Sequence, residues 1–361
     1  LIPLWVADMD FATAPFVTDA IRKRCENEVL GYTGKPDSYY NAIINWVKQR
    51  YDLIVTKEVI NFVPGIVPGI GMAMNCFTQK GDKVMIQPPV YHPFAWVTTR
   101  NERTLVINPL KWENGMYRMD LDAFREQIKG CKLFILCNPH NPGGVVWTEA
   151  ELRAIADICY DEKVLVFSDE IHADLTLPPH THRPFATVSE KARMNSVTFM
   201  SPSKAFNMPG LSASHALIFN EDLRKRFRIY MDAGELDMGH VFAFLSVEAA
   251  YSHGTEWLDQ CLAYIQGNID FVDEFLKKHA PKIKAIRPEA SYLVWLDCRE
   301  LELSQKDLNE FFVDKAHLAL NDGEMFGKEG IGFMRLNVAS PRCIIEKAMK
   351  QLADAYQLYI K

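Results

Sequence analysis

The chain has 361 residues, of which 48% are hydrophobic and 24% charged, and its formal net charge at pH 7 is −6. This length is sufficient for a large core and favours more than one domain. A negative balance argues against an overall positive field for nucleic acid or an anionic membrane. No apolar run reaches the roughly 18 residues of a membrane span. We therefore expect a soluble protein whose partner is a small molecule.

Eight cysteines are spread along the chain, and none belongs to a Cys-x-x-Cys pair. Several lie in apolar runs, as Cys137 does in Phe134-Ile135-Leu136-Cys137, where cysteine behaves as a small buried hydrophobic residue. The opening residues have no charged leader before an apolar stretch, so we expect no signal peptide. These features predict a reducing, cytoplasmic compartment.

Through the middle of the chain, short apolar runs alternate with amphipathic stretches. Buried strands are predicted at residues 83–87, 132–137, 164–168, 196–200 and 215–219. Between two of these runs, residues 149–161 carry Leu152, Ile155 and Cys159 at helical spacing. Strands that alternate with helices indicate an α/β fold with a mostly parallel sheet wrapped by helices.

The C-terminal part shows another pattern. A helical pattern over residues 255–279 is followed by strand-like runs at 284–286, 292–296 and 333–338, with a helix before the last run and another after it. This order predicts a smaller α+β domain. The expected organisation is an N-terminal segment packing with the small domain (1–30), a large cofactor-binding domain (31–261) and a small C-terminal domain (262–361).

Polar segments follow three of the predicted strands. These segments are Asn138–Gly144, Asp169–His172 and Ser201–Lys204. In doubly wound sheets, ligands bind at the carboxyl ends of the strands. An amide, a carboxylate and a lysine at successive strand ends therefore predict one convergent site.

Lys204 is the candidate nucleophile of this site. A lysine just past a buried strand is lightly solvated, which lowers its pKa and suits it to forming a Schiff base with an aldehyde. Asp169 would keep a pyridine nitrogen protonated, and Asn141 could donate to a ring hydroxyl. The glycine- and proline-rich segment 63–71 precedes a helical stretch and offers backbone N–H groups to a phosphate.

The motifs NPHNPGG (138–144), SDEIH (168–172) and SPSK (201–204), in this order, resemble the aminotransferase class I/II superfamily, fold type I of the pyridoxal-5′-phosphate (PLP) enzymes. The opening WVADMDF (5–11), with GYTG (31–34), is similar to a narrower branch, the cystathionine β-lyase or C-S lyase group, which is cystalysin-like. Each motif alone is moderately specific, whereas the ordered set is highly specific and covers essentially the whole chain.

The resemblance implies the fold, the cofactor and the partners. The fold would be a large domain with a mostly parallel seven-stranded sheet sandwiched by helices, plus a smaller α+β C-terminal domain. The cofactor would be PLP, the partner a small amino-acid substrate, and the assembly a homodimer with shared active sites. We expect no metal, because His180 and His182, although near His172, lie beside Pro178-Pro179 in what looks like a loop.

The resemblance also implies how the cofactor is bound. Lys204 would bind it as a Schiff base and later shuttle protons, while Asp169 pairs with the ring nitrogen and Asn141 contacts the ring oxygen. Tyr91 would stack on the ring face, although a core role is a close alternative. His172 would either contact the ring hydroxyl or be a buried histidine satisfied by its neighbours.

The phosphate and the substrate have implied partners as well. The phosphate would be held by the backbone of Ile66 and Val67, by the hydroxyls of Ser201 and Ser203, and by Tyr32 of the partner subunit. In the apolar run 333–338, Arg335 needs an anionic partner, and the resemblance makes that the substrate α-carboxylate. Other substrate-side residues would be Asn141, Trp5 and Asp8, the last two with packing as an equal alternative.

Two positions depart from the pattern of aspartate-type aminotransferases. His172 stands where they carry a tyrosine, three residues after Asp169, and Ser212 stands where they carry a phosphate-binding arginine, eight residues after Lys204. Both departures match the C-S lyase branch. The family pattern therefore defines the phosphate-binding residues less well than it defines the Schiff-base lysine.

The implied activity is β-elimination from L-cystathionine or related cysteine S-conjugates, giving a thiol, pyruvate and ammonia. An aminotransferase would use the same residues up to the carbanion and then reprotonate the cofactor carbon. A PLP-binding regulatory protein acting through protein contacts is a further alternative, although no helix-turn-helix extension or basic arm suggests DNA binding. Intact Lys204, Asp169 and Arg335 favour catalysis and leave both alternatives open.

Overall fold

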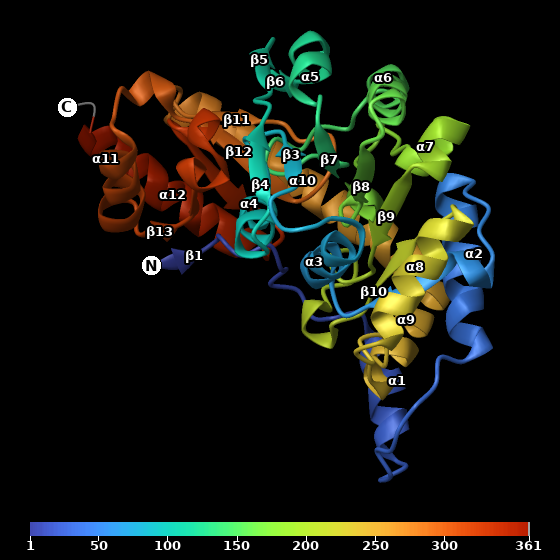
Figure 1. Ribbon diagram of the computed structural model, residues 1–361. Helices are drawn as coiled ribbons and strands as arrows, with labels where there is room; N and C mark the ends of the chain where they lie inside the picture. Colours follow the sequence, from blue (N-terminus) through green and yellow to red (C-terminus); the bar gives the residue numbers. More distant parts are fainter. Residues whose placement is uncertain (360–361) are drawn as a thin grey trace.

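A seven-stranded sheet forms the centre of the larger part of the molecule (Figure 1) in the computed structural model, which describes residues 1–359. Its order is β2-β10-β9-β8-β7-β3-β4. The strands are β2 (Ile60–Val63), β3 (Lys83–Ile86), β4 (Thr104–Ile107), β7 (Cys131–Cys137), β8 (Leu165–Asp169), β9 (Ser196–Met200) and β10 (Ser214–Leu217). Strand β10 is antiparallel to both neighbours, and the other pairs are parallel. The predicted mostly parallel α/β sheet is confirmed.

Helices cover both faces of this sheet. In β7, Leu133 and Ile135 belong to the apolar cluster on one face, and Phe134 and Leu136 to the cluster on the other. The first face is covered by α3 (Ile66–Phe77), α4 (Pro93–Arg100) and α8 (Glu221–Asp232), the second by α5 (Leu121–Gln127), α6 (Glu149–Asp161) and α7 (Glu190–Met194). Burial on both faces explains why the strand is a continuous apolar run.

Three helices form a packed group at the lower right of Figure 1: α1 (Pro15–Cys25), α2 (Asp37–Tyr51) and α9 (Val241–His253). Both α1 and α2 pack against α9. In this group, Trp46 of α2 stacks on Tyr251 of α9 with ring centroids 4.9 Å apart. The long helix α10 (Thr255–His279) follows α9 and leads to the smaller sheet.

The smaller sheet has four strands in the order β11-β12-β15-β14, all antiparallel. They are β11 (Lys284–Ile286), β12 (Leu293–Asp297), β14 (Asn321–Asp322) and β15 (Phe333–Asn337). The helices α11 (Gln305–Glu310) and α12 (Arg342–Tyr359) belong to the same part of the chain. This arrangement is the α+β part that the C-terminal pattern predicts. The domain limits at residues 31 and 262 stay a prediction.

The N-terminal segment touches both parts of the molecule. Strand β1 (Ile2–Pro3) pairs in parallel with β13 (Leu318–Ala319), beside the C-terminal helices, whereas α1 packs on α9 at the other end (Figure 1). Residues 4–13 connect the two, and we call them the N-terminal strap. A small hairpin of β5 (Lys111–Glu113) and β6 (Met116–Arg118) forms a sheet of its own and contacts the small sheet, where the indole of Trp295 donates to the hydroxyl of Tyr117. Within residues 1–359, no helix is long and apolar enough to cross a membrane.

Candidate functional site

A cavity of about 210 Å³ lies at the carboxyl ends of β7, β8 and β9. The three polar segments that follow these strands all contribute to its wall, and so does the first turn of α3. The predicted residues that line it are Ile66, Val67, Tyr91, Asn141, Asp169, His172, Ser203 and Lys204. Because parallel strands deliver their carboxyl ends to one edge, residues far apart in sequence share this space.

Asp169 is the last residue of β8, and its carboxyl group is buried at the cavity wall. Its Oδ1 accepts a hydrogen bond from the backbone N–H of Ile171 at 3.1 Å. Burial raises the pKa of Asp169 to about 7, with a further rise from Glu170, while the Ile171 bond and the Lys204 charge oppose the increase. A protonated ring nitrogen placed here would stabilise the ionised carboxylate, so this group fits the pyridine of PLP.

Lys204 lies in the turn after β9, and its Nζ donates a hydrogen bond to the carbonyl of Ala7 in the N-terminal strap. Burial, and then the charge of Arg335, lower the pKa of Lys204 to about 8, against opposing contributions from Asp8 and Asp169. Only a neutral amine attacks an aldehyde, so a lowered pKa makes this lysine a competent Schiff-base former.

The start of α3 is the best anion site of the cavity. Helix α3 begins after Gly65, whose φ of +146° suits glycine, and no side chain caps the helix. The backbone N–H groups of Ile66 and Val67 therefore face the cavity at a helix N-terminus. Such an end carries partial positive charge and suits a phosphate.

Three serines also line the cavity: Ser203, Ser212 and Ser214. Ser201 lies behind this wall: its Oγ is 2.7 Å from the carbonyl of Ala213 and 2.9 Å from the Oγ of Ser203. Ser201 therefore orients Ser203, and Ser203 faces the cavity. Hydroxyl groups and helix N–H groups could therefore bind a phosphate without an arginine at position 212.

His172 and Tyr91 complete the wall. Burial, followed by the charges of Lys204 and Arg335, lowers the pKa of His172 to about 3, so the imidazole is neutral at neutral pH. Its buried Nδ1 has no hydrogen-bond partner in the part of the chain that the structure describes. An unpartnered buried nitrogen at the cavity fits a ligand group such as a ring hydroxyl. The ring of Tyr91 packs edge-on against Phe94, with centroids 5.7 Å apart.

Arg335 of β15 is buried, and neutral oxygens surround its guanidinium. Its Nη1 donates to Asn141 Oδ1 at 3.0 Å, and its Nη2 donates to the Trp5 carbonyl at 3.0 Å and to Asn321 Oδ1 at 2.5 Å. The ring of Phe326 lies 4.8 Å from the guanidinium carbon. Burial lowers the pKa of Arg335 to about 10, so it stays cationic and suits a carboxylate.

Five predicted residues do not line the cavity. Arg335 bonds the lining residue Asn141, and Ser201 bonds the lining residue Ser203. The other three are Tyr32, Trp5 and Asp8. Tyr32 is 98% exposed and lies beside residues 238–241. Trp5 is half exposed and Asp8 is exposed. The structure uses these two residues through their backbone, because the Trp5 carbonyl accepts from Arg335 and the Asp8 carbonyl from Asn337.

Sequence reasoning missed several contributors. Asn321 accepts a hydrogen bond from Arg335. It lies in a strand of only two residues, which is too short to form an apolar run that predicts a strand. The carbonyl of Ala7 is a backbone group, which no residue type reveals. Tyr292 donates its hydroxyl to that same carbonyl at 2.9 Å, and Asn207 holds the strap. The only sequence signal for Asn207 is its place three residues after Lys204.

The three histidines considered for a metal each have different surroundings. His182 Nε2 is 2.8 Å from Glu170 Oε2, and both side chains are buried. His180 Nδ1 is 3.7 Å from Glu289, whereas His172 faces the cavity. Over residues 1–359 there is no group of three or more His, Cys, Asp and Glu side chains placed to hold a metal ion.

This geometry agrees with the comparisons to known proteins. The family model described as aminotransferase class I and II matches residues 1–352. The chain belongs to this family.

Two curated relatives match nearly the whole chain. Cystathionine beta-lyase PatB of Bacillus subtilis is 38% identical over 98% of this chain and 92% of its own length. Protein MalY of Escherichia coli is 30% identical over 98% of this chain and 91% of its own length. Aspartate aminotransferases match at lower identity, for example 22% for the Bacillus subtilis protein.

Solved structures agree over the whole chain. Cystalysin from Treponema denticola, which contains a pyridoxal 5′-phosphate cofactor, superposes with a TM-score of 0.97 at 34% identity, covering 100% of this chain and 92% of that one. The PLP-bound C-S lyase from Staphylococcus hominis has a TM-score of 0.91 at 34% identity, covering 98% and 90%. The fold type I architecture expected from the motifs is confirmed.

Proposed function

We propose that this protein is a PLP-dependent carbon–sulfur β-lyase that cleaves L-cystathionine or related cysteine S-conjugates to a thiol, pyruvate and ammonia. One observation carries the proposal: Lys204, with its lowered pKa, shares a buried site with Asp169 and with the charge-uncompensated Arg335. The names of PatB and of the C-S lyase structures support the lyase over other activities of the family.

The cavity fits PLP group by group. Its aldehyde would meet Lys204, its ring nitrogen Asp169, and its ring oxygen Asn141 and His172. The phosphate and the ring face would be held by Ile66, Val67, Ser203 and Tyr91, with Ser201 behind Ser203. When bound, PLP supplies an electron sink next to the substrate Cα.

The chain's own residues then perform the reaction. Arg335 would hold the α-carboxylate of the amino acid and fix the direction of the Cα–H bond. Displaced from the cofactor by the substrate amine, Lys204 Nζ would accept the Cα proton, because its lowered pKa leaves part of the amine neutral near pH 7. The Cβ–S bond would break with the electron pair leaving on sulfur, and the three-carbon product would hydrolyse to pyruvate and ammonia.

The decisive experiment is pyruvate release from L-cystathionine by the purified, PLP-loaded protein, coupled to lactate dehydrogenase. We expect catalytic pyruvate with an equal amount of thiol, and no release by a Lys204→Ala variant. Amino-group transfer to an added 2-oxo acid without pyruvate would instead assign the protein to the aminotransferases and refute the lyase.

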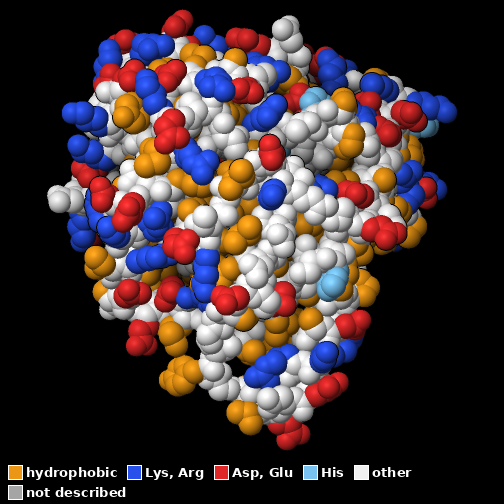
Figure 2. Space-filling model, turned by 90° about the vertical axis from the view of Figure 1, so that its right-hand side faces the viewer, with side chains coloured by type: hydrophobic (Ala, Val, Ile, Leu, Met, Phe, Trp, Pro, Cys, Tyr) orange, Lys and Arg blue, Asp and Glu red, His pale blue; other side chains and the backbone are white. Residues whose placement is uncertain are grey.

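We further propose a homodimer in which Tyr32 reaches the phosphate of the partner's cofactor. The support is exposure: Val29, Leu30 and Tyr32 are 71%, 60% and 98% exposed in the segment between α1 and α2. Figure 2 shows hydrophobic side chains gathered on the lower half of one face of the molecule. A single chain rarely exposes apolar side chains so close together, and a second copy would cover them.

We also propose a cytoplasmic location. All eight cysteines are free, and five of them are buried. Buried thiols without partners are typical of proteins that work in a reducing compartment, which supports a cytoplasmic location. The proposed substrate is a small amino acid, in line with the names of the cystathionine beta-lyase and C-S lyase relatives.

A further inference from the structure

Asn207 joins the N-terminal strap to the turn that carries Lys204. Its Oδ1 accepts from the backbone N–H of Met9 at 2.9 Å, and its Nδ2 donates to the carbonyls of Met9 at 2.8 Å and Phe11 at 2.7 Å. Its own carbonyl accepts from the hydroxyl of Thr13 at 2.7 Å. One side chain and one carbonyl therefore hold three residues of the strap.

The backbone around Asn207 is suited to this task. Its φ of +51° lies in the left-handed region, which asparagine tolerates better than most residues. The same turn is closed by backbone hydrogen bonds from Phe206 to Pro202 and from Met208 to Ser203, on either side of Lys204. The strap is thus fastened directly to the rigid turn of the reactive lysine.

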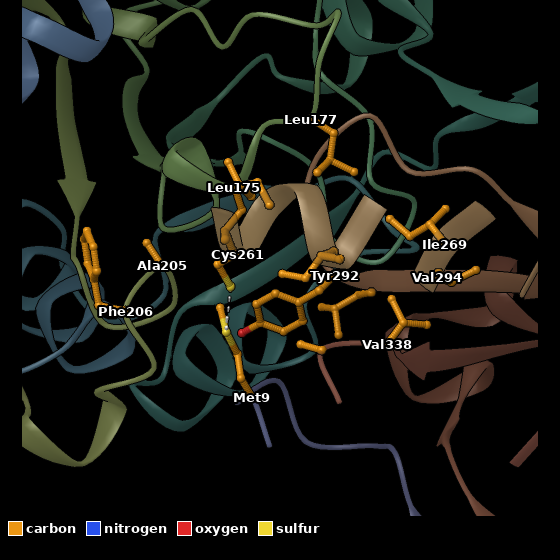
Figure 3. Packing of buried hydrophobic residues seen from close by; sticks show 14 of the residues in the cluster. Met9, Leu175, Leu177, Ala205, Phe206, Cys261, Ile269, Tyr292, Val294 and Val338 are labelled. Carbon is orange, nitrogen blue, oxygen red and sulfur yellow. Dashed lines mark hydrogen bonds between the residues drawn. The ribbon is translucent and has the colours of Figure 1, made fainter. Parts of the chain in front are cut away.

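The small sheet holds the other side of the strap. Asn337, two residues after Arg335, donates to the carbonyls of Val6 and Asp8, both at 2.6 Å. The side chain of Met9 is buried, and its sulfur lies 3.9 Å from that of Cys261, next to the ring of Tyr292 (Figure 3). Tyr292 in turn donates to the Ala7 carbonyl.

Two carbonyls of the strap touch the reacting machinery. The Ala7 carbonyl accepts from Lys204 Nζ, and the Trp5 carbonyl accepts from Arg335 Nη2. Because both oxygens belong to one short segment, any displacement of that segment removes an acceptor from the lysine and from the arginine together. Asp169 and the first turn of α3, which would hold the ring nitrogen and the phosphate of the cofactor, lie outside the strap.

We propose that Asn207 is a positioning residue, which fixes the strap so that its carbonyls orient Lys204 and Arg335 for the amino-acid substrate. The inference rests on the proposed function, because it assigns substrate binding to Arg335. It requires that loosening the strap weakens substrate binding while the affinity for PLP is kept.

Two substitutions test this. Asn207→Gly removes the side chain and still allows the left-handed backbone, whereas Asn207→Asp keeps an acceptor for Met9 N–H but sets a carboxylate oxygen against two carbonyls. The matched controls are Asn114→Gly and Asn114→Asp, because Asn114 is an exposed hairpin asparagine with a φ of +50° and no contact with the strap. Each protein is compared with wild type as the PLP-loaded enzyme.

The ligand is L-alanine, which has no β-leaving group and so cannot eliminate. Its binding is followed by the change in the cofactor absorption band. We expect the dissociation constant for L-alanine to rise about tenfold in both Asn207 variants, in line with the loss of one or two partly buried hydrogen bonds, and that for PLP to change by less than about twofold. Hydrogen exchange of a peptide spanning residues 4–13 should accelerate in both variants and not in the controls.

Unchanged L-alanine affinity in the Asn207 variants, whether or not exchange accelerates, would overturn the inference. An equal loss of PLP affinity would overturn it too, since it would show general damage to the site. If the Asn207 variants fail to fold, Thr13→Val is measured instead, because it removes one hydrogen bond to the Asn207 carbonyl. We expect this variant to bind L-alanine about threefold more weakly. Unchanged L-alanine binding would refute the role of Asn207. The pyruvate assay separates this outcome from a failure of the proposed function: a wild-type enzyme that binds L-alanine but releases no pyruvate from L-cystathionine would refute the lyase and not the role of Asn207 in binding the amino acid.

Discussion

Arg335 donates a hydrogen bond from Nη1 to Oδ1 of Asn141 over 3.0 Å, which ties strand β15 of the small sheet to the loop after β7 of the large one. Asn141 lines the cofactor cavity, so the proposed carboxylate-binding group and the proposed contact of the ring oxygen fix each other. This bond, together with those of Arg335 to Trp5 and Asn321, sets the proposed carboxylate-binding group relative to the proposed cofactor site.

Arg335→Lys should raise KM for L-cystathionine by about 30- to 100-fold with a smaller change in kcat. A lysine places one ammonium where the guanidinium offers parallel donors, and the lost charge-assisted bond is worth about 2–3 kcal/mol. Steady-state pyruvate formation measures both constants. Arg153→Lys, on the exposed face of α6, is the control. An unchanged KM would show that the α-carboxylate binds elsewhere.

Asp169→Asn should stabilise the cofactor-free protein, and more so at higher pH. The pKa of Asp169 rises from 3.8 to about 7 on folding. The stability that its bound proton provides is therefore complete below about pH 4 and is lost as the pH rises through 7. Between pH 5.5 and pH 8 the advantage of asparagine should grow by about 2 kcal/mol.

Urea unfolding at these two pH values measures this difference, with Asp354→Asn, an exposed site on α12, as the control. With PLP bound, the order should reverse, because the ring nitrogen then stabilises the carboxylate. A pH-independent difference between wild type and Asp169→Asn would contradict the buried, proton-holding carboxyl.

Capture of PLP by the cofactor-free protein should depend on pH through Lys204. With a pKa of about 8, the neutral fraction of this amine rises about fivefold between pH 7 and pH 8 and flattens above pH 9. Arg335→Gln removes a positive charge that lowers this pKa, so its profile should move to higher pH. Stopped-flow absorbance follows the rate. A shift of the Arg335→Gln profile to lower pH would be evidence against this coupling.

Tyr32→Phe should weaken PLP binding by about tenfold without dissolving the dimer. The variant loses only a hydroxyl that the shared-site arrangement gives to the partner's phosphate, and one hydrogen bond to a charged group is worth about 1.5 kcal/mol. Equilibrium dialysis measures PLP, and sedimentation measures the dimer. Tyr160→Phe, about half exposed on α6, serves as the control. Wild-type PLP affinity in Tyr32→Phe would argue against the shared site.

The sequence was sufficient for the centre of the sheet. Strands β7, β8 and β9 are buried on both faces, so each is mostly apolar, and the polar residues that end these runs mark the cavity. Strands β2 and β4 were not predicted. Asn61 interrupts the first of these strands, and the second is an edge strand that is only partly buried.

The surroundings of Arg335 could not be predicted in the same way. Its acceptors come from Trp5, Asn141 and Asn321, and one of them is a backbone carbonyl. A carbonyl is present at every position, so only the folded path of the chain decides which carbonyl reaches a functional group. The motifs predict which residues react, whereas the groups that hold those residues depend on contacts between distant segments.

The neutral environment of Arg335 has a practical consequence for assays. Every oxygen that bonds its guanidinium within residues 1–359 belongs to an amide or a carbonyl, so its positive charge attracts any small anion that enters the cavity. Sulfate or acetate in a buffer would compete with the amino acid and raise its apparent KM in proportion to concentration. Kinetic constants for this enzyme will therefore be comparable between laboratories only at matched anion composition.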